Sequence, residues 1–339
     1  MPFEIVRNDI TKMHVDAIVN PTNSKLYGTA GVDGAIHKIE GPRLREETAK
    51  IGRLEPGQCA LTKAFNLPAG YIIHTVGPIW NKGTGRKEDI LRNTYRNALE
   101  LARKKGFESI AFPLISSGTY GCPKDVALNI AIRSIGEFLL FNEMTLYLVV
   151  FDKKSYQLSE DLFSSVEAYI DDNYIDEQEY TLLRRNRLME KADYLQDDEA
   201  LSESISSKMM EQVKPKKKSI DDAIHHLDET FSKTLLRMID ERGLKDPEVY
   251  KKANVTKQTF SKIRNNNQYN PTKQTVLAFA IALQLNLDEA KDLLLRSGYA
   301  LSKSSRFDVI ISYFFESENY DIYEINEVLF AYDQNLLGV

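Results

Sequence analysis

Short runs of β-branched and other apolar residues alternate with longer amphipathic segments through the first half of the chain. The strand-like runs occupy residues 3–6, 17–20, 60–65, 71–77, 109–115 and 145–151. The helix-like segments occupy residues 34–52, 87–106, 125–140 and 159–172. Alternation of this kind predicts a three-layer α/β/α fold, with a largely parallel or mixed central sheet that carries helices on both faces.

A change of composition divides the chain into two parts. Residues 171–219 are highly charged, show little periodicity and end in a basic cluster, so we expect a linker that is partly helical and partly mobile. Residues 220–339 carry a series of short helical patterns. At roughly 100–200 residues per domain, the sequence therefore predicts an α/β domain at 1–170 and an all-α domain at 220–339.

Composition excludes several classes of protein. The formal net charge is −5, which is not typical of a chain that binds nucleic acid over its whole surface, although a local basic patch remains compatible with it. The two cysteines, Cys59 and Cys122, lack CxxC partners, which excludes a Cys-rich zinc module and a disulfide framework. The N-terminus does not resemble a signal peptide, and no apolar run approaches the roughly 18–20 residues of a membrane span. We expect a soluble cytoplasmic protein without a membrane partner.

Two glycine-containing loops follow predicted strands and lead into predicted helices. The first is "NPTNSKLYGTAGVDGAIH" (20–37), and the second is "SSGTYGCP" (116–123). Glycine allows the backbone to approach a ligand closely, and free N–H groups at the start of a helix bind phosphate. In open α/β sheets such loops meet at the carboxyl edge of the strands. Either loop alone is weak evidence, but together they predict a diphosphate held between them.

The ordered motifs "NDITKMHVDAIVNPTN…GVDGAIH", "NLPAGYIIHTVGPIW" and "PLISSGTYGCP" resemble those of a macrodomain over roughly residues 1–170. The resemblance implies an ADP-ribose-binding module. It is closest to the branch that removes ADP-ribose from acidic side chains and deacetylates O-acetyl-ADP-ribose. The implied partner is ADP-ribose or an ADP-ribosylated protein, and neither a metal nor a cofactor is implied.

The resemblance also implies roles for individual residues. Asp9 would accept a hydrogen bond from the adenine amino group, with a backbone contact from Ile10. The adenine side would also include Phe151 and Asp152. The two diphosphate loops would consist of Gly31, Val32 and Gly34, and of Ser117, Gly118, Thr119 and Tyr120, with the Tyr120 ring against the distal ribose.

The expected reaction centre contains Asn23, Asp33 and His37. Asp33 can position or deprotonate a water molecule, while the neutral amide of Asn23 can hold a ribose hydroxyl without adding repulsion next to two phosphates. His37, one helical turn after Asp33, would help to hold this region. The clamped diphosphate would supply binding energy remote from the reacting bond.

Structural roles compete with these functional ones. Asn20 ends a strand and is expected to brace the loop rather than to do chemistry, although it stays among the ligand-binding candidates. His37 can be a structural histidine, and Asp33 can cap the following helix. His74 lies inside an apolar strand and is expected to be packed with a satisfied ring, and nothing near Cys122 would make it a nucleophile.

The sequence departs from the usual family pattern at three places. Asn8 replaces a glycine, "NPTN" (20–23) replaces Asn-Ala-Ala-Asn, and "GTAG" (28–31) replaces a run of four glycines. The last change introduces Thr29 and Ala30, which stiffen the loop, so we expect an altered affinity or rate. The Asn23/Asp33 pair is intact, which favours retention of the hydrolase activity.

The helical half contains a second motif. Residues 246–253, 254–255 and 256–264 resemble the first helix, the turn and the recognition helix of the lambda-repressor-like helix-turn-helix family. Thr256 is a candidate N-cap. Val255, Phe260 and Ile263 would face inward. The outward side chains, suited to base edges and phosphates, would be Lys257, Gln258, Ser261, Lys262 and Arg264.

Charge is unevenly distributed along this half. Residues 242–306 contain 12 Lys/Arg against 5 Asp/Glu, a net +7, whereas residues 307–339 contain 7 Asp/Glu and no Lys/Arg, a net −7. The basic part favours nucleic acid, and the acidic tail can shield it or dock on it. DNA, RNA and a protein partner all remain open for this domain. The alternative for the whole chain is a non-catalytic transcriptional regulator that senses ADP-ribose.

Overall fold

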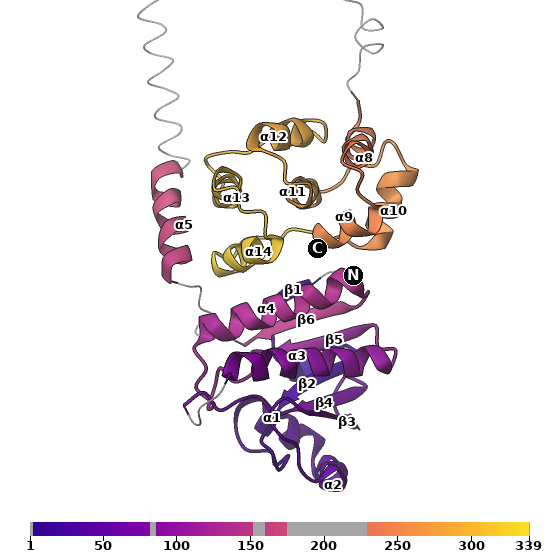
Figure 1. The fold of residues 1–339 in the computed structure, drawn as a ribbon, viewed down its shortest axis with the longest axis vertical. Helices are drawn as coiled ribbons and strands as arrows, with labels where there is room; N and C mark the ends of the chain where they lie inside the picture. The colour runs from indigo at the N-terminus through magenta and orange to yellow at the C-terminus, as the bar shows by residue number, and fades with distance from the viewer. Residues whose placement is uncertain (1–2, 82–85, 152–159, 175–228, 339) are drawn as a thin grey trace, which may run out of the picture.

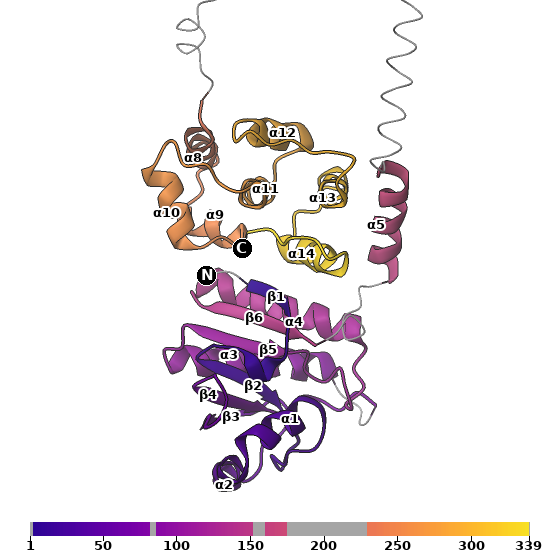
Figure 2. The same cartoon turned by 180° about the vertical axis from the view of Figure 1, so that it is seen from behind.

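The computed structural model describes residues 3–81, 86–151, 160–174 and 229–338. It contains an α/β unit and a helical unit, which lie against each other (Figure 1). The chain termini lie between the two units in both views (Figures 1 and 2). No helix in these described ranges is both long enough and apolar enough to cross a membrane.

The α/β unit is built on a six-stranded sheet with the order β1-β6-β5-β2-β4-β3. The strands are β1 (Phe3–Arg7), β2 (Ala17–Pro21), β3 (Cys59–Lys63), β4 (Tyr71–Thr75), β5 (Ser109–Pro113) and β6 (Thr145–Val150). Five strands run parallel, and β3 alone pairs antiparallel, at the edge beside β4. The predicted mixed sheet is confirmed, and the parallel strands share one carboxyl edge.

Helices cover both faces of this sheet (Figures 1 and 2). They are α1 (Gly31–Glu40), α2 (Pro42–Ile51), α3 (Lys87–Lys104) and α4 (Lys124–Phe141), with a short 3-10 helix η1 (Ile10–Lys12) after β1. Side chains alternate along β2, so Ala17 and Val19 join the core with α3 and α4, while Ile18 joins the core with α1 and α2. The predicted α/β/α layering is therefore observed.

The single helix expected over residues 34–52 is wrong, because the chain forms α1 and α2 there. Gly41 separates them with a φ of +70°, a conformation that a side chain disfavours. Pro42 then occupies the first turn of α2, where its missing N–H costs no helical hydrogen bond. The Gly-Pro pair was the local signal for this break.

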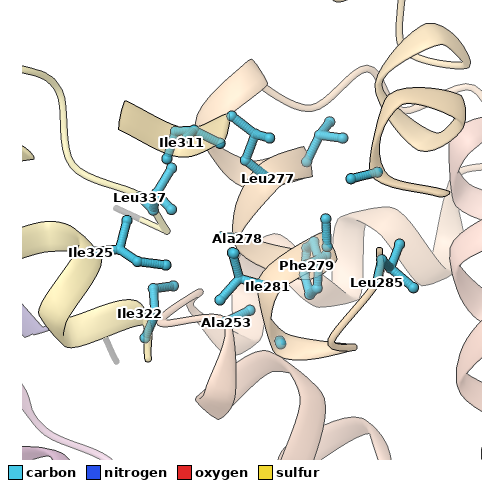
Figure 3. Close-up of a cluster of buried hydrophobic side chains, with 14 of the residues drawn as sticks. Ala253, Leu277, Ala278, Phe279, Ile281, Leu285, Ile311, Ile322, Ile325 and Leu337 are labelled. Carbon is cyan, nitrogen blue, oxygen red and sulfur yellow. The ribbon is translucent and has the colours of Figure 1, made fainter. Parts of the chain in front are cut away.

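The helical unit encloses one large apolar core, part of which is shown in Figure 3. Its helices are α8 (Phe231–Glu241), α9 (Asp246–Lys252), α10 (Lys257–Asn265), α11 (Lys273–Ala282), α12 (Leu287–Leu295), α13 (Arg306–Glu316) and α14 (Ile322–Ala331). From Val276 onward, helix α11 is apolar all round; it lies in the middle of the unit, with Leu277, Phe279 and Ile281 fully or almost fully buried. The predicted all-α character of this half is confirmed.

Helix α5 (Glu160–Asn173) belongs with the helical unit, although residues up to 170 were expected to close the first domain. Its Val166 and Ile170 join the helical core, and Tyr169 meets Tyr313 edge-to-face with ring centroids 5.3 Å apart. An amphipathic pattern shows that a helix has an apolar face but not which core that face covers. Of the expected linker 171–219, the part after residue 174 lies outside the described residues.

The two units are joined through the edge strand β1. The side chain of Asn254, in the helix-turn-helix turn, accepts a hydrogen bond from Phe3 N (2.7 Å) and donates one to Phe3 O (2.9 Å). At the other end of β1, Arg7 pairs with Asp333 at 2.9 Å. An open sheet edge is prone to pairing with other chains, and the helical unit covers this one.

Candidate functional site

The candidate site lies at the carboxyl edge of the parallel strands. A cleft of about 510 Å³ opens there between the loops that follow β2 and β5. Its walls are Pro21, Thr22, Asn23, Thr29, Ala30, Gly31, Val32, Gly77, Leu114, Ile115, Ser116, Ser117, Gly118, Thr119 and Tyr120. Because β2 and β5 are neighbours in the sheet, the two loops predicted to form a clamp do face a common space.

The first loop ends at the start of α1. Gly31 has a φ of +60°, and Ala30 precedes it in an extended conformation without a side-chain cap. The backbone N–H groups of Gly31 and Val32 make no hydrogen bond within the described residues. Free N–H groups at the positive end of a helix attract anions, and here they lie on the wall of the cleft.

The second loop presents a similar set of donors. The N–H groups of residues 117–120 donate no hydrogen bond within the part of the chain that the structure describes. The loop is fixed from behind, because Cys122 N donates to Ser116 O (2.9 Å) and Trp80 N donates to Tyr120 O (2.7 Å). Two opposed rows of backbone donors suit a ligand that carries two phosphates.

Asp33 lies just behind the wall of the cleft and is 2% exposed. Its Oδ1 accepts from Asn20 Nδ2 at 2.8 Å, and its Oδ2 accepts from Thr22 Oγ1 at 3.1 Å. Thr29 N also donates to Oδ2, at 3.3 Å. The carboxylate thus fixes the loop. Its partners Thr22 and Thr29 are part of the cleft wall, so they lie between the carboxylate and the cleft.

The charge state of this centre is set mainly by burial. Burial raises the pKa of Asp33, while the hydrogen bond from Asn20 and the charge of His37 act in the opposite direction. Burial lowers the pKa of His37, against the negative charge of Asp33. His37 Nε2 lies 3.5 Å from Asp33 Oδ1. With its pKa below the ordinary value of about 6.5, His37 is mostly neutral at pH 7.

Asn20 and His74 form a buried support beneath Asp33. Asn20 Nδ2 lies 3.2 Å from His74 Nδ1, and His74 Nε2 lies 2.9 Å from Thr62 Oγ1. Because the Asn20 amide donates, Nδ1 must accept, and the ring proton therefore sits on Nε2 and points to Thr62. Both predictions for these residues agree with the structure: Asn20 braces, and the His74 ring is satisfied.

Asn23 and Tyr120 both lie on the wall of the cleft. The Asn23 side chain is held within its own loop, since Nδ2 donates to Tyr27 O and Oδ1 accepts from Lys25 N, each at 2.9 Å. Burial raises the pKa of Tyr120, and the nearby negative charge of Asp33 adds to the effect. The structure therefore places Asn23 and Tyr120 on the wall of the cleft, with Asp33 near Tyr120 and behind that wall.

The residues expected at the adenine follow the other strands of the same edge. Asp9 and Ile10 come after β1, and the exposed Phe151 comes directly after β6. Asp9 caps η1, with Oδ1 accepting from Thr11 N and Thr11 Oγ1. Asp152 lies outside the described residues. Because β6 and β1 lie beyond β5 in the sheet, these residues continue the line of the cleft.

Gly34 and Gly28 allow the loop and helix α1 to pack closely against each other. A Cβ on Gly28 would lie 2.4 Å from His37 Cβ and Cγ, and one on Gly34 would lie 3.3 Å from Thr29 O. These short distances show that neither position has room for a side chain and that the loop packs closely against α1. Gly34, expected at the diphosphate, is not on the wall of the cleft, whereas Gly31 and Val32 are.

Neither cysteine has the properties of a catalytic nucleophile. Burial raises the pKa of Cys122 to about 12, with further contributions from Asp125 and Glu88. Burial likewise raises the pKa of Cys59. Both thiols are therefore protonated near neutrality. Within the described ranges, no group of three or more His, Cys, Asp or Glu side chains is placed to hold a metal ion.

The cleft residues that sequence reasoning missed include Thr22, Gly77 and Ser116. Thr22 stands in the quoted "NPTN" motif, where its hydroxyl was a signal for a contact to the nearby acid. Gly77 ends the run "YIIHTVG", and a glycine directly after a strand often marks close backbone approach. Nothing in the sequence distinguished Ser116 from Ser117.

The helix-turn-helix expected in the second domain is present. Thr256 caps α10 by accepting from Thr259 N, and Phe260 and Ile263 are buried with Val255. The side chains predicted to face outward are exposed, namely Lys257, Gln258, Ser261, Lys262 and Arg264. Arg264 pairs with Asp246 of α9 at 2.7 Å, so its charge is partly neutralised.

The acidic tail contacts both units. Asp308 pairs with Lys273 at 2.6 Å inside the helical unit, and Asp333 reaches Arg7 of the α/β unit. Neither of these ion pairs involves α10. The exposed face of the recognition helix therefore remains basic.

The fold and the cleft together define an α/β/α nucleotide-binding unit, and the comparisons with known proteins identify it. A family model described as "Macro domain" matches residues 19–131, and one described as "Cro/C1-type HTH DNA-binding domain" matches residues 234–293. A "Macro domain-containing protein" of Methanosarcina mazei is 47% identical over 155 residues, covering 45% of this chain and 83% of the relative. An "O-acetyl-ADP-ribose deacetylase" of Escherichia fergusonii is 41% identical over 162 residues, covering 46% of this chain and 92% of the relative.

Among solved structures, the Oceanobacillus iheyensis macrodomain with MES bound is 40% identical. It has a TM-score of 0.45 and covers 49% of this chain and 92% of its own. The identity and the coverage of the curated relatives show that this chain belongs to the macrodomain family. These relatives match only the N-terminal half, so they say nothing about the helical unit.

Proposed function

We propose that the α/β unit binds ADP-ribose and hydrolyses ADP-ribosyl ester linkages. The observation that carries the proposal is the cleft itself, in which two rows of free backbone N–H groups lie beside Asp33. Relatives of similar length to this unit are named O-acetyl-ADP-ribose deacetylases, which supports a hydrolase acting on an acyl ester of ADP-ribose.

In this proposal the groups of residues around the cleft contact different parts of the ligand. The N–H groups of Gly31, Val32 and residues 117–120 hold the diphosphate, while Asp9, Ile10 and Phe151 lie on the adenine side. Asn23 and the Tyr120 ring contact the distal ribose. Asp33, from behind Thr22 and Thr29, positions or deprotonates the attacking water, and His37 holds the carboxylate in place. Remote binding of the diphosphate contributes to catalysis at the ester.

The finer proposal concerns the substrate. Both O-acetyl-ADP-ribose and mono-ADP-ribose on acidic side chains of proteins present an ester at the same ribose, so one reaction centre can serve both. Thr29 and Ala30 are exposed on the wall of the cleft, and they are the positions at which we expect affinity or rate to depart from that of the relatives.

The test is a turnover assay with both substrates. Wild type should release free ADP-ribose, while Asp33→Ala and Asn23→Ala should turn over at least about 100-fold more slowly, within the usual range for loss of a group in acid–base chemistry. Both variants should still bind ADP-ribose. Glu137→Ala, on the exposed face of α4, serves as the control. Tight binding by wild type without turnover would support the sensing regulator instead.

For the helical unit we propose nucleic-acid binding through the exposed face of α10. The observation that favours it is the basic helix-turn-helix surface with Lys257 and Lys262 exposed. A gel-shift series in salt should show a slope that decreases by about one for each lysine replaced by alanine. Absence of retention at low salt, with or without ADP-ribose, would point to a protein partner.

A further inference from the structure

Three buried side chains form a continuous network of hydrogen bonds that ends on Asp33. Thr62 Oγ1 lies 2.9 Å from His74 Nε2, and His74 Nδ1 lies 3.2 Å from Asn20 Nδ2. The same amide nitrogen donates to Asp33 Oδ1 at 2.8 Å. Asn20 and His74 are fully buried and Thr62 is almost so, and none of the three lies on the wall of the cleft. The Thr62–His74–Asn20 network therefore reaches the proposed base from the side away from the ligand.

The register of the sheet builds this network. Asn20 and His74 are direct partners in the β2–β4 pair, and Thr62 lies opposite Ile72, two residues before His74, in the β3–β4 pair. Residues two apart in a strand share a face of the sheet. Ile72 joins the same core as Ile36 of α1. The three polar side chains thus cross the adjacent strands β3, β4 and β2 on the face that α1 covers (Figure 1).

The charge of Asp33 fixes which group donates along the network. An ionised carboxylate only accepts, so Asn20 must present an N–H to it. The other N–H of that amide then points to His74 Nδ1, the neutral ring carries its proton on Nε2, and Thr62 accepts that proton. The reverse order requires the Asn20 amide to turn over, so that its oxygen faces both the ring and a protonated carboxyl. Within the described residues, Asn20 Oδ1 has no hydrogen-bond partner that would prevent this turn.

We propose that Thr62 and His74 are positioning residues for the reaction: Thr62 holds the ring proton of His74 on Nε2, and the ring thereby holds the Asn20 amide with its N–H toward Asp33. The inference rests on the proposed function, in which Asp33 positions or deprotonates the attacking water. A hydrogen bond to the charged form of a carboxyl favours that form. The edge strand β3 therefore contributes to the ionisation of a base that it does not touch.

The other titratable groups around Asp33 do not depend on this network. His37 Nε2 lies 3.5 Å from Asp33 Oδ1 on the same helix, and Arg45 of α2 acts on His37 by its charge. Tyr120 of the second loop lies near enough for the Asp33 charge to raise its pKa. Burial, with a smaller effect of His37, lowers the pKa of His74 to about 3, so its ring stays neutral from neutral pH down to about pH 5. A change from hydroxyl to methyl in the network alters none of these charges.

Thr62→Val is the variant that tests the network. Valine keeps the shape of threonine but leaves the His74 Nε2–H without an acceptor, and a buried N–H without a partner is rarely tolerated. The ring then carries its proton on Nδ1, the Asn20 amide turns its oxygen toward it, and Asp33 loses a donor. Thr62→Ser restores the hydroxyl and should restore the wild-type order. Thr48→Val, which removes a buried hydroxyl in α2, is the matched control.

The first readout is the pH dependence of kcat/KM with O-acetyl-ADP-ribose. We expect the acid limb to move up by about 0.5–1 pH unit in Thr62→Val, the shift that loss of one hydrogen bond to the charged form produces. Thr62→Ser and Thr48→Val should keep the wild-type limb. Near neutral pH, all variants should bind ADP-ribose with the wild-type Kd, because Thr62 does not line the cleft.

The second readout does not depend on turnover. Nitrogen NMR of the full chain should find the His74 ring proton on Nε2 in wild type and on Nδ1 in Thr62→Val. A carboxyl titration of Asp33 by carbon NMR should move in the same direction as the acid limb. Wild type with the proton on Nδ1, an unmoved limb in Thr62→Val, or an equal shift in Thr62→Ser would each overturn the inference.

Failure of the proposed function gives a different result. If wild type neither binds ADP-ribose nor hydrolyses the ester, the activity assigned to the cleft is wrong. The ring proton of His74 and the titration of Asp33 remain measurable in that case, and they still show whether Thr62 controls the ionisation of this carboxyl.

Discussion

Thr22 donates its hydroxyl to Asp33 Oδ2 at 3.1 Å, and both residues are buried. The family pattern has alanine at the position of Thr22, so this donor is an addition. Hydrogen bonds to the charged form of a carboxyl favour that form. Thr22 therefore helps to keep Asp33 ionised against the effect of burial, which raises its pKa.

The first prediction is that Thr22→Val shifts the acid limb of the pH–rate profile to higher pH. Valine keeps the shape of threonine but cannot donate, so the pKa of Asp33 rises further and the ionised base is lost earlier on acidification. The pH dependence of kcat/KM measures this limb. Thr48→Val removes a buried hydroxyl in α2 that donates to Arg45 O, and it should leave the limb in place.

The same variant makes a matching prediction for stability. A folded pKa above that of the unfolded chain gives stability that is present below the unfolded pKa and is lost as pH rises through the folded pKa. Thr22→Val should therefore be destabilised by about 1–2 kcal/mol at pH 7, where the buried carboxylate lacks a donor, and by less at pH 4. An equal loss at both pH values in urea unfolding would contradict this account.

The second prediction concerns His74, whose pKa is lowered to about 3 by burial and by His37. A folded pKa below that of the unfolded chain gives stability that is present above the unfolded value of about 6.5 and lost as pH falls toward 3. His74→Gln keeps a donor and an acceptor but does not titrate. Between pH 7 and pH 5, wild type should lose about 2 kcal/mol more than this variant. Parallel pH profiles in urea unfolding would show that His74 is not the cause.

The third prediction separates a glycine that faces the ligand from one that packs. A Cβ on Gly118 would meet no atom within 4 Å, whereas a Cβ on Gly28 would meet His37 at 2.4 Å. Gly118→Ala should keep its stability and bind ADP-ribose about 10-fold more weakly, because the methyl group enters the space of the ligand. Gly28→Ala should lose about 1–3 kcal/mol of stability. Calorimetric binding and thermal unfolding distinguish the two, and a stable Gly118→Ala with normal affinity would refute the ligand contact.

Local signals in the sequence were sufficient for the elements and for much of the site. The pattern around Thr256, Phe260 and Ile263 predicted the cap and the buried face of α10, because an N-cap and helical spacing are local properties. The loops after β2 and β5 were predicted to meet, since parallel strands share an edge. The break at Gly41 was also local, but the glycine before Pro42 was overlooked.

Other features depend on which surfaces meet, and the sequence does not encode them locally. Helix α5 covers the helical core through Val166 and Ile170, although its position in the chain suggested the α/β unit. The left-handed conformation of Ser116 depends on the packing of its loop against Gly77. The pairing of Asn254 with Phe3 joins residues 251 positions apart.

The two proposed sites lie at opposite ends of α4. The loop that lines the cleft leads into the start of this helix, whereas its far end meets α9 through Tyr250, which donates to Glu143 at 3.0 Å. With 18 residues, α4 spans about 27 Å. The cleft therefore lies away from the helix-turn-helix, and a bound substrate does not have to be part of the nucleic acid.

The last prediction tests the junction between the units. Asn254 adopts a φ of +54° and uses its amide to pair with both backbone groups of Phe3. Aspartate tolerates this conformation but cannot donate to Phe3 O, and it would place a carboxylate against a carbonyl oxygen. Asn254→Asp should therefore cost about 1–3 kcal/mol and loosen the contact between the units while each remains folded.

Limited proteolysis and urea unfolding measure this effect. In Asn254→Asp, the helical unit should unfold in a separate transition at lower urea, and the edge strand β1 should become accessible to protease. Asn173→Asp loses a hydrogen bond within α5, to Tyr169 O, and serves as the matched control because it does not touch the junction. If both variants unfold in one transition at the wild-type midpoint, the Asn254–Phe3 pair does not hold the units together.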